Sequence, residues 1–210
     1  MVSNVYDLNS LKTKSQAPVI LDCGANVGFV TRFALRAGAR QVFAFEPSPG
    51  NVACLRRNLK EEIDAGEVVI IPKGVWDRET TLAFRTENKN NPGAHCVTED
   101  GTGDLNVPVT SIDEACSKLG LSRVDYIKLD VEGAEVRAIT GDERVIREYR
   151  PWLCVATEHT DDLFANSVEV IGAVRRIEPQ YRCVCTEAHV NYSPSRGSVL
   201  TRTRCYFVER

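Results

Sequence analysis

The stretch VILDCGANVGFVTRFALRAG, residues 19–38, decides the fold of this chain. It begins with an apolar run, typical of a strand covered on both faces. A turn containing Gly24, Asn26 and Gly28 follows directly, and the hydrophobic residues after it recur at helical spacing up to Gly38, a residue suited to end a helix. The stretch therefore predicts a buried strand, a glycine turn and a helix in immediate succession.

The same alternation continues along the chain. Apolar runs suited to buried strands lie at 18–23, 41–46, 67–72, 124–130 and 152–158. Helical patterns cover 26–38, 48–66, 111–120 and 133–149. Strands that alternate with helices favour a doubly wound, mostly parallel sheet. The sequence therefore predicts an α/β fold of the Rossmann-like kind.

The pattern changes after residue 160. A helical segment near 163–176 is followed by two strand-like runs at 181–190 and 199–210, with the turn-rich NYSPSRGS between them. Two strands without an intervening helix indicate an antiparallel hairpin, which we expect at the edge of the sheet.

The length of 210 residues favours a single domain spanning 1–210. Residues 1–17 form an N-terminal extension, and 77–108 form an irregular insertion. Within the insertion, 77–87 alternates like a strand, and the Asn- and Gly-rich segment 88–104 is expected to be a loop. A loop of this length in a compact domain is usually functional or mobile.

The overall charge argues against some partners. The net charge of −3 and the pI near 5.7 give no electrostatic footprint for nucleic acid or anionic membranes. Neither a signal peptide nor an apolar run long enough to span a membrane is visible, so the expected location is the cytoplasm.

The eight cysteines show no metal-binding spacing, and we expect reduced packing thiols. Cys183 and Cys185 would share one face of a strand, but neighbours on one strand have poor geometry for a disulfide.

Acidic residues stand where the predicted strands end. In an open α/β sheet, ligands bind beyond the carboxyl ends of the strands. The residues that we expect at this edge are Asp22, Glu46, Asp130 with Glu132, and Glu158 with His159. The sequence therefore predicts one acidic site built from several strand ends.

The first two strand ends suggest the kind of ligand. Gly24 and Gly28 allow close approach to the backbone, and the following helix presents free N–H groups. Glu46 follows Gly28 by 18 residues, close to the distance at which an acid binds ribose hydroxyls in nucleotide-binding folds. The turn lacks the G-x-G-x-x-G spacing of a diphosphate cradle, and Asp22 would repel a pyrophosphate. A ligand with an amino-acid tail, a ribose and an adenine fits better than a dinucleotide.

With these residues the chain resembles the FkbM family of class I S-adenosylmethionine-dependent methyltransferases. The resemblance covers roughly residues 19–160. It rests on LDCGANVGF (21–29), FAFEPSPGNVACLRRNL (43–59), KGVWDRETTLAF (73–84) and TSIDEA with VDYIKLDVEGAE between 110 and 135.

The resemblance implies roles for individual residues. Gly24, Asn26 and Gly28 would cradle the methionine part of S-adenosylmethionine, with Asp22 supporting the turn. Glu46, followed by Pro47, would bind the ribose. Gly74, Val75 and Trp76 would flank the adenine. Asp130 would face the methyl-donor end, with Glu132 nearby.

The expected reaction is methylation of a hydroxyl on a small molecule, sugar or glycan precursor. A base is useful because the alcohol loses its proton as it attacks. The candidates for this base are Asp130, Glu158 and His159. His95, on the insertion, is a weaker candidate. No metal is expected, although Asp130, Glu132, Glu158 and His159 would suit a divalent ion.

Two other function classes remain open from the sequence. A nucleotide-dependent oxidoreductase could use the same sheet, and nicotinamide binding would identify it. A non-catalytic module that binds an adenosyl ligand would bind the cofactor without transferring a methyl group.

Overall fold

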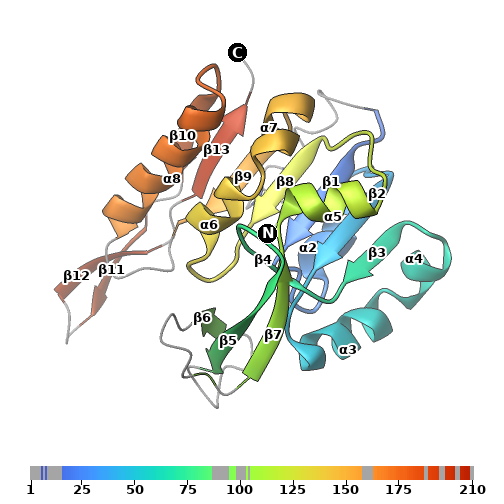
Figure 1. Ribbon diagram of the computed structural model, residues 1–210. Coiled ribbons are helices and arrows are strands. Elements are labelled where there is room, and N and C mark those ends of the chain that lie inside the picture. Colours follow the sequence, from blue (N-terminus) through green and yellow to red (C-terminus); the bar gives the residue numbers. More distant parts are fainter. Residues whose placement is uncertain are drawn as a thin grey trace.

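The computed structural model describes residues 6, 8, 16–86, 95–97, 103, 105–157, 163–186, 189–193, 197–201 and 204–208. Within these residues a seven-stranded main sheet has the order β10-β13-β9-β8-β1-β2-β3 (Figure 1). Its strands are β1 (Val19–Cys23), β2 (Gln41–Phe45), β3 (Val68–Ile71), β8 (Tyr126–Leu129), β9 (Trp152–Ala156), β10 (Arg182–Thr186) and β13 (Arg204–Val208). All five strands predicted from uninterrupted apolar runs are confirmed.

The direction of the strands confirms a mostly parallel sheet with an antiparallel end. Neighbouring strands from β9 to β3 pair in parallel. β13 pairs antiparallel with both β9 and β10, so it lies between them and β10 forms the edge. The segment that joins them contains a separate hairpin of β11 (His189–Ser193) and β12 (Gly197–Thr201).

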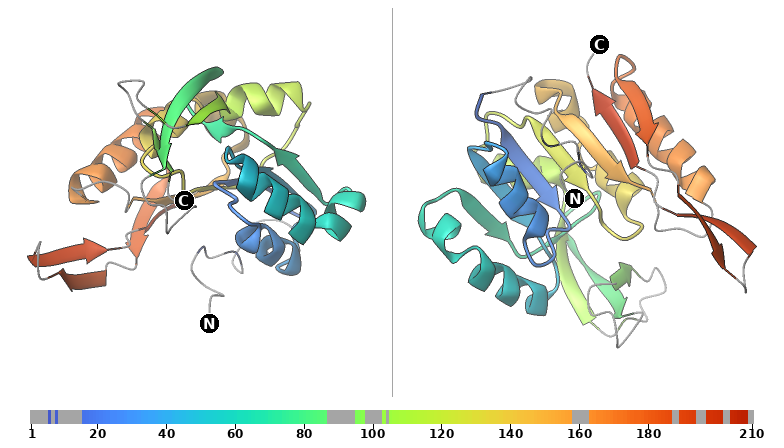
Figure 2. Two further views of the ribbon diagram at one scale, coloured as in Figure 1. Left: turned by 90° about the horizontal axis from the view of Figure 1, so that it is seen from below. Right: turned by 180° about the vertical axis from the view of Figure 1, so that it is seen from behind.

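Helices cover both faces of the main sheet (Figure 2). They are α2 (Phe29–Arg36), α3 (Pro49–Asn58), α4 (Lys60–Asp64), α5 (Ile112–Lys118), α6 (Glu135–Thr140), α7 (Glu143–Tyr149) and α8 (Leu163–Ile177). Leu21 and Phe43 pack with residues of α5 to α8, whereas their neighbours Ile20 and Val42 pack with Ala34 of α2. Alternate strand residues therefore enter opposite cores, which explains the uninterrupted apolar runs.

Two of the predicted helices are each divided in two. The segment 48–66 forms α3 and α4, and 133–149 forms α6 and α7. At the second break, a Cβ on Gly141 would lie 2.5 Å from the carbonyl oxygen of Trp76, so only glycine permits this approach. Ser48 is the N-cap residue of α3, but its side chain makes no capping bond.

The insertion is more regular than the sequence predicts. β4 (Gly74–Val75), β5 (Thr80–Thr86), β6 (His95–Val97) and β7 (Leu105–Thr110) form a second sheet in the order β4-β7-β5-β6, below the main sheet in Figure 1. The strand predicted within 77–87 is confirmed. The loop expected at 88–104 is wrong in part, because His95–Val97 pairs with the end of β5.

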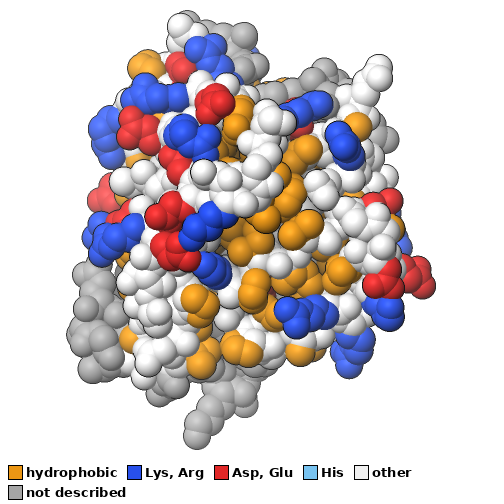
Figure 3. Space-filling view, turned by 45° about the vertical axis from the view of Figure 1, so that its right-hand side comes forward, with side chains coloured by type: hydrophobic (Ala, Val, Ile, Leu, Met, Phe, Trp, Pro, Cys, Tyr) orange, Lys and Arg blue, Asp and Glu red, His pale blue; other side chains and the backbone are white. Residues whose placement is uncertain are grey.

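The edge strand β3 leaves part of its apolar surface uncovered. Val69, Ile70 and Ile71 are half-buried. On the side of the molecule that bears β3 and α4, hydrophobic side chains gather near the centre and charged ones lie around them (Figure 3). None of the described helices combines the length and the apolar character that crossing a membrane requires.

Asp142, between α6 and α7, supplies a test of the core. It is completely buried, and burial, followed by the nearby charge of Asp113, raises the pKa of its carboxyl well above the usual range. A raised folded pKa means that the protein loses stability as the pH rises above the ordinary aspartate pKa. Asp142→Asn should therefore stabilise the protein near pH 8 by about 1–3 kcal/mol, with no gain near pH 4.

Urea unfolding at the two pH values measures this difference, and the exposed Asp64→Asn serves as the control. An equal effect of Asp142→Asn at both pH values would contradict the assignment of a buried, raised carboxyl.

Candidate functional site

A cavity of about 330 Å³ opens at the carboxyl ends of β1, β2 and β8. Eight of the residues predicted for the site line it: Gly24, Asn26, Glu46, Pro47, Gly74, Val75, Asp130 and Glu132. Tyr6, Phe29, Phe84 and Lys128 also line it. The topology therefore brings together strand ends that lie far apart in the sequence, as expected for an open α/β sheet.

The glycine turn lies on top of β1 in a conformation that requires its residues. Gly24 has a φ of 83°, and a Cβ there would lie 2.0 Å from the carbonyl oxygen of Asp130. Asn26 also has a positive φ, of 51°, which asparagine tolerates better than most residues. The N–H groups of Gly24 and Ala25 donate to the carbonyl oxygen of Phe45, at 3.0 and 2.9 Å. The turn is thereby fixed against the ends of β2 and β8.

Glu46 connects this turn to the start of α3. Its Oε2 accepts from the Asn26 N–H at 2.8 Å, and its Oε1 accepts from the Ser48 N–H at 2.9 Å and the Asn51 amide at 3.3 Å. The side chain is almost completely buried, yet it lines the cavity. Carboxylate oxygens have several acceptor positions, so Glu46 can hold the loop and still accept bonds from a ligand.

Two residues that were predicted to contact the cofactor directly lie elsewhere. Gly28 does not line the cavity; a Cβ there would lie 2.7 Å from Leu55 of α3, so this glycine serves helix packing. Trp76 is buried in the core of the second sheet with Phe84 and Val107, and it also lies outside the cavity lining. Sequence position alone does not distinguish a strand-end residue that faces a cavity from one that faces a core.

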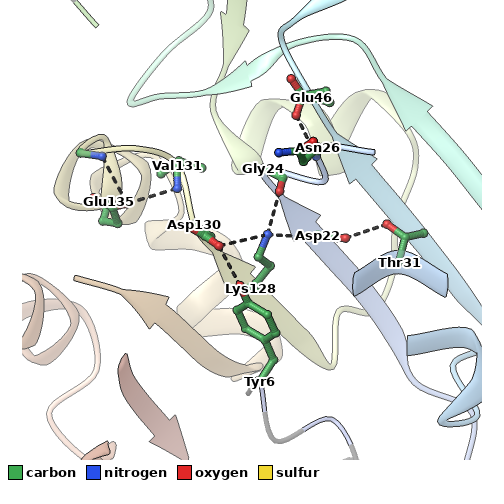
Figure 4. A network of polar contacts seen from close by, with 11 residues as sticks. Tyr6, Asp22, Gly24, Asn26, Thr31, Glu46, Lys128, Asp130, Val131 and Glu135 are labelled. Atoms are coloured by element: carbon green, nitrogen blue, oxygen red, sulfur yellow. Dashed lines mark hydrogen bonds and ion pairs between the residues drawn. The ribbon is translucent and has the colours of Figure 1, made fainter. Parts of the chain in front are cut away.

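A buried lysine lies at the centre of the polar contacts in the site (Figure 4). Lys128 Nζ donates to the Gly24 carbonyl oxygen at 2.7 Å and lies 3.1 Å from Asp22 Oδ1 and 3.7 Å from Asp130 Oδ2. Burial alone would lower the pKa of Lys128, but the charges of Asp22 and Asp130 outweigh it and raise that pKa above the ordinary value. Lys128 therefore stays protonated and ties the glycine turn to the acids of β1 and β8.

Asp22 supports this arrangement from below. It is completely buried, and its Oδ2 accepts a 2.6 Å hydrogen bond from the hydroxyl of Thr31 in α2. It does not line the cavity. Its place agrees with the supporting role that the family resemblance implies.

Tyr6 contributes to the site from the N-terminal extension. Its hydroxyl donates to Asp130 Oδ2 at 2.8 Å, and its ring lies 5.4 Å from Lys128 Nζ and 4.8 Å from the guanidinium carbon of Arg204. Burial and then the charge of Asp130 raise the pKa of the Tyr6 phenol. The phenol therefore stays protonated as a hydrogen-bond donor to Asp130.

The loop after β8 is held by an acid that the sequence reading did not single out. Glu135 is completely buried, and its Oε1 accepts from the N–H groups of Val131 and Gly133 at 3.2 and 3.4 Å (Figure 4). Asp130 and Glu132 are not the caps of α6, whose N-cap residue is Ala134. Both line the cavity.

The remaining candidates are not tested by the structure. Glu158 and His159 lie outside the described residues, and of His95 and His189 only the strand backbone is described. Among the described residues, the one group of three or more possible metal ligands is formed by Cys183, Cys185 and Cys205 on β10 and β13. The acidic metal site considered from the sequence therefore stays a hypothesis.

Lys128, Tyr6, Thr31 and Glu135 are thus parts of the site that the sequence reading missed. A signal was available for Lys128, because a lysine inside the buried run YIKL requires an acidic partner. Tyr6 carried no comparable signal, since nothing in its local sequence indicates the contact with Asp130.

The glycine turn supplies a stability prediction. Gly24→Ala would place a methyl group against the Asp130 carbonyl oxygen and should destabilise the protein by more than the about 1–2 kcal/mol of left-handed strain alone. Gly120→Ala is the matched control, because Gly120 has a φ of 64° but nothing within 4 Å of an added Cβ. Urea unfolding compares the two, and equal losses would show that the contact with Asp130 does not matter.

Comparison with known proteins gives the family context. The family model described as "Methyltransferase FkbM domain" matches residues 22–181. The 2-O-methyltransferase NoeI of Sinorhizobium fredii is 26% identical over 80% of this chain and 73% of its own length. The hexuronic acid methyltransferase AglP of Haloferax volcanii is 26% identical over 62% of this chain and 52% of its own length.

Solved structures give the same fold. A crystal structure of methyltransferase FkbM from Methylobacillus flagellatus superposes with a TM-score of 0.64 at 19% identity, over 95% of this chain and 47% of that one. An O-methyltransferase from Bacillus cereus in complex with SAH gives 0.54 at 12% identity, over 100% and 82%. This chain thus spans about half the length of AglP and of the Methylobacillus protein.

Proposed function

Because this chain belongs to the FkbM family of methyltransferases, we propose that it transfers a methyl group from S-adenosylmethionine to a hydroxyl of a sugar or another small molecule. We propose that residues 1–210 act as one catalytic domain. The observation that carries the proposal is the single cavity in which the glycine turn, Glu46 and Asp130 meet.

The residues that line the cavity fit this cofactor. S-adenosylmethionine, when bound, supplies a methyl group that its sulfonium makes electrophilic. Gly24 and Asn26 would hold the methionine part, since the turn exposes backbone where a larger residue at position 24 would not fit. Glu46 would accept bonds from the ribose hydroxyls, and Pro47, Gly74 and Val75 would flank the adenine.

We assign Asp130 as the base that acts on the acceptor hydroxyl. It lines the cavity, its side chain is 23% exposed, and Tyr6 and Lys128 fix its position. A fixed carboxylate can orient an acceptor hydroxyl and take its proton as the oxygen attacks, which typically contributes about 10²–10⁴-fold. Glu158 and His159 stay as the alternative bases, and Glu132 lies on the rim of the same cavity.

The names of the relatives support a carbohydrate acceptor. One is a 2-O-methyltransferase and another a hexuronic acid methyltransferase. We therefore propose a sugar hydroxyl as the acceptor and expect nucleic acid not to be methylated. The family assignment gives no support to a nicotinamide-dependent oxidoreductase.

The proposal is tested by incubating the full chain with methyl-labelled S-adenosylmethionine and a panel of neutral sugars, hexuronic acids, oligosaccharides and RNA. We expect label in a carbohydrate, retained after mild alkali, because a methyl ether survives treatment that cleaves a methyl ester. Label confined to RNA would contradict the acceptor class. Cofactor binding without transfer to any acceptor would favour the non-catalytic binding module.

A further inference from the structure

Three cysteines gather on one face of the last two strands of the main sheet. Cys183 and Cys185 lie on β10, and Cys205 lies on β13 directly opposite Cys185. Cys185 Sγ is 2.6 Å from Cys205 Sγ and 3.8 Å from Cys183 Sγ. Residues two apart on a strand share a face, and directly opposed residues share it too. The antiparallel register therefore brings together thiols that lie 20 positions apart in the chain.

The surroundings give these thiols different reactivities. Cys185 is exposed, Cys183 is partly buried and Cys205 is buried. Cys185 is therefore the thiol of the pair that a small disulfide from solvent reaches first.

We propose that Cys185 and Cys205 form a reversible disulfide that joins β10 to β13, with Cys185 as the thiol that reacts first. Directly opposed residues of an antiparallel pair have Cα atoms about 4.5–5.5 Å apart, within the about 4.4–6.8 Å that disulfides span. The obstacle seen from the sequence, two neighbours on one strand, does not apply to a pair on adjacent strands.

The oxidant in this proposal is a low-molecular-weight disulfide. The Cys185 thiolate attacks one of its sulfurs, forms a mixed disulfide and releases one small thiolate. The Cys205 thiol then gives its proton to the released small thiolate and attacks Cys185 Sγ, which breaks the mixed disulfide and expels the second small thiolate, protonated by water. The two cysteines lose two electrons, and the small disulfide gains them and becomes two thiols. An added dithiol reverses both steps.

The bond would form close to the candidate site. Arg204 pairs with Ala156 at the end of β9, and its guanidinium lies over the ring of Tyr6, which donates to Asp130. Cys205 is the next residue. The proposal concerns only the chemistry of the thiols, so it does not depend on the proposed methyl transfer.

The test treats the full-length chain with oxidised glutathione and identifies linked peptides by mass spectrometry without reduction. We expect a Cys185–Cys205 linked peptide within one chain, lighter by one hydrogen molecule than the separate peptides and lost on adding dithiothreitol. Cys185→Ser should abolish the link without disturbing the core, because this side chain is exposed. Cys205→Ser should instead leave a glutathione adduct on Cys185.

Cys54→Ser and Cys183→Ser are the matched controls, and both should keep the link. Cys54 lies on α3, away from the cluster in sequence and fold. The proposal is overturned if both thiols of the pair stay open to alkylation after oxidation, or if the link joins only different chains. It is also overturned if the purified chain carries one zinc ion that must be removed before these thiols react.

Discussion

Asp130→Asn should lower the rate of methyl transfer by about 10²–10⁴-fold, because an amide cannot take the proton of the acceptor hydroxyl. The substitution preserves the shape of the side chain and its ability to accept the Tyr6 hydrogen bond. The affinity for S-adenosylhomocysteine should change much less than the rate, since Glu46 and the glycine turn are untouched. Single-turnover kinetics with labelled cofactor, together with calorimetry, separates the two effects.

Tyr6→Phe is the control that disturbs the position of the Asp130 carboxylate without removing its charge. It removes the hydroxyl that donates to Asp130 and leaves the carboxylate in place, so the loss should be about tenfold or less. A full rate in Asp130→Asn would assign the proton transfer to Glu158 or His159 instead. A loss in Tyr6→Phe as large as that in Asp130→Asn would show that Asp130 acts mainly through its position.

Lys128→Met should destabilise the protein by about 3–5 kcal/mol, because it leaves the carboxylates of Asp22 and Asp130 without the positive charge that compensates them. Lys128 is 2% exposed, Asp22 is completely buried, and the Gly24 carbonyl oxygen would also lose its donor. The loss should appear as a lower urea midpoint with an unchanged slope. Lys60→Met serves as the control, because that lysine is exposed and its pair with Asp64 lies in solvent, so no measurable change is expected.

A double-mutant cycle identifies the cause. Asp22→Asn with Lys128→Met should cost less than the sum of the two single variants, because the uncompensated acid has been removed. Additive losses would show that Lys128 stabilises the protein through packing and its bond to Gly24 rather than through charge.

The sequence predicted the part of the fold that depends on local patterns. Uninterrupted apolar runs located the five parallel strands of the main sheet, since a strand covered on both faces has no polar side. Gly24, Asn26 and Glu46 were predicted for one site because strand ends of a parallel sheet meet at one edge. That reasoning needs only the order of the elements along the chain.

What the sequence did not predict depends on contacts between distant segments. Tyr6 reaches Asp130 across 124 positions, and β6 exists because the end of β5 offers it an edge. Gly28 and Trp76 follow strands as expected, but Gly28 lies against Leu55 of α3 and Trp76 packs in the core of the second sheet. The register that sets Cys185 opposite Cys205 likewise arises only when β13 enters between β9 and β10.

Glu46 and the glycine turn form the cofactor site that we propose. Glu46→Gln places an amide N–H where either the Asn26 N–H or the Ser48 N–H now donates, so one of these bonds is lost. The substitution also removes the charge that we propose as the acceptor for the ribose hydroxyls. A bond to a charged group is worth about 1.5–3 kcal/mol, which corresponds to about tenfold to 150-fold in affinity. The exposed Glu67→Gln is the matched control.

Isothermal titration calorimetry of S-adenosylhomocysteine into the wild type, Glu46→Gln and Glu67→Gln tests this most directly. We expect one molecule to bind per chain of the wild type and of Glu67→Gln, and the affinity of a folded Glu46→Gln to be about tenfold to 150-fold lower. Absence of binding to the wild type, or equal affinity in all three proteins, would contradict the proposed site.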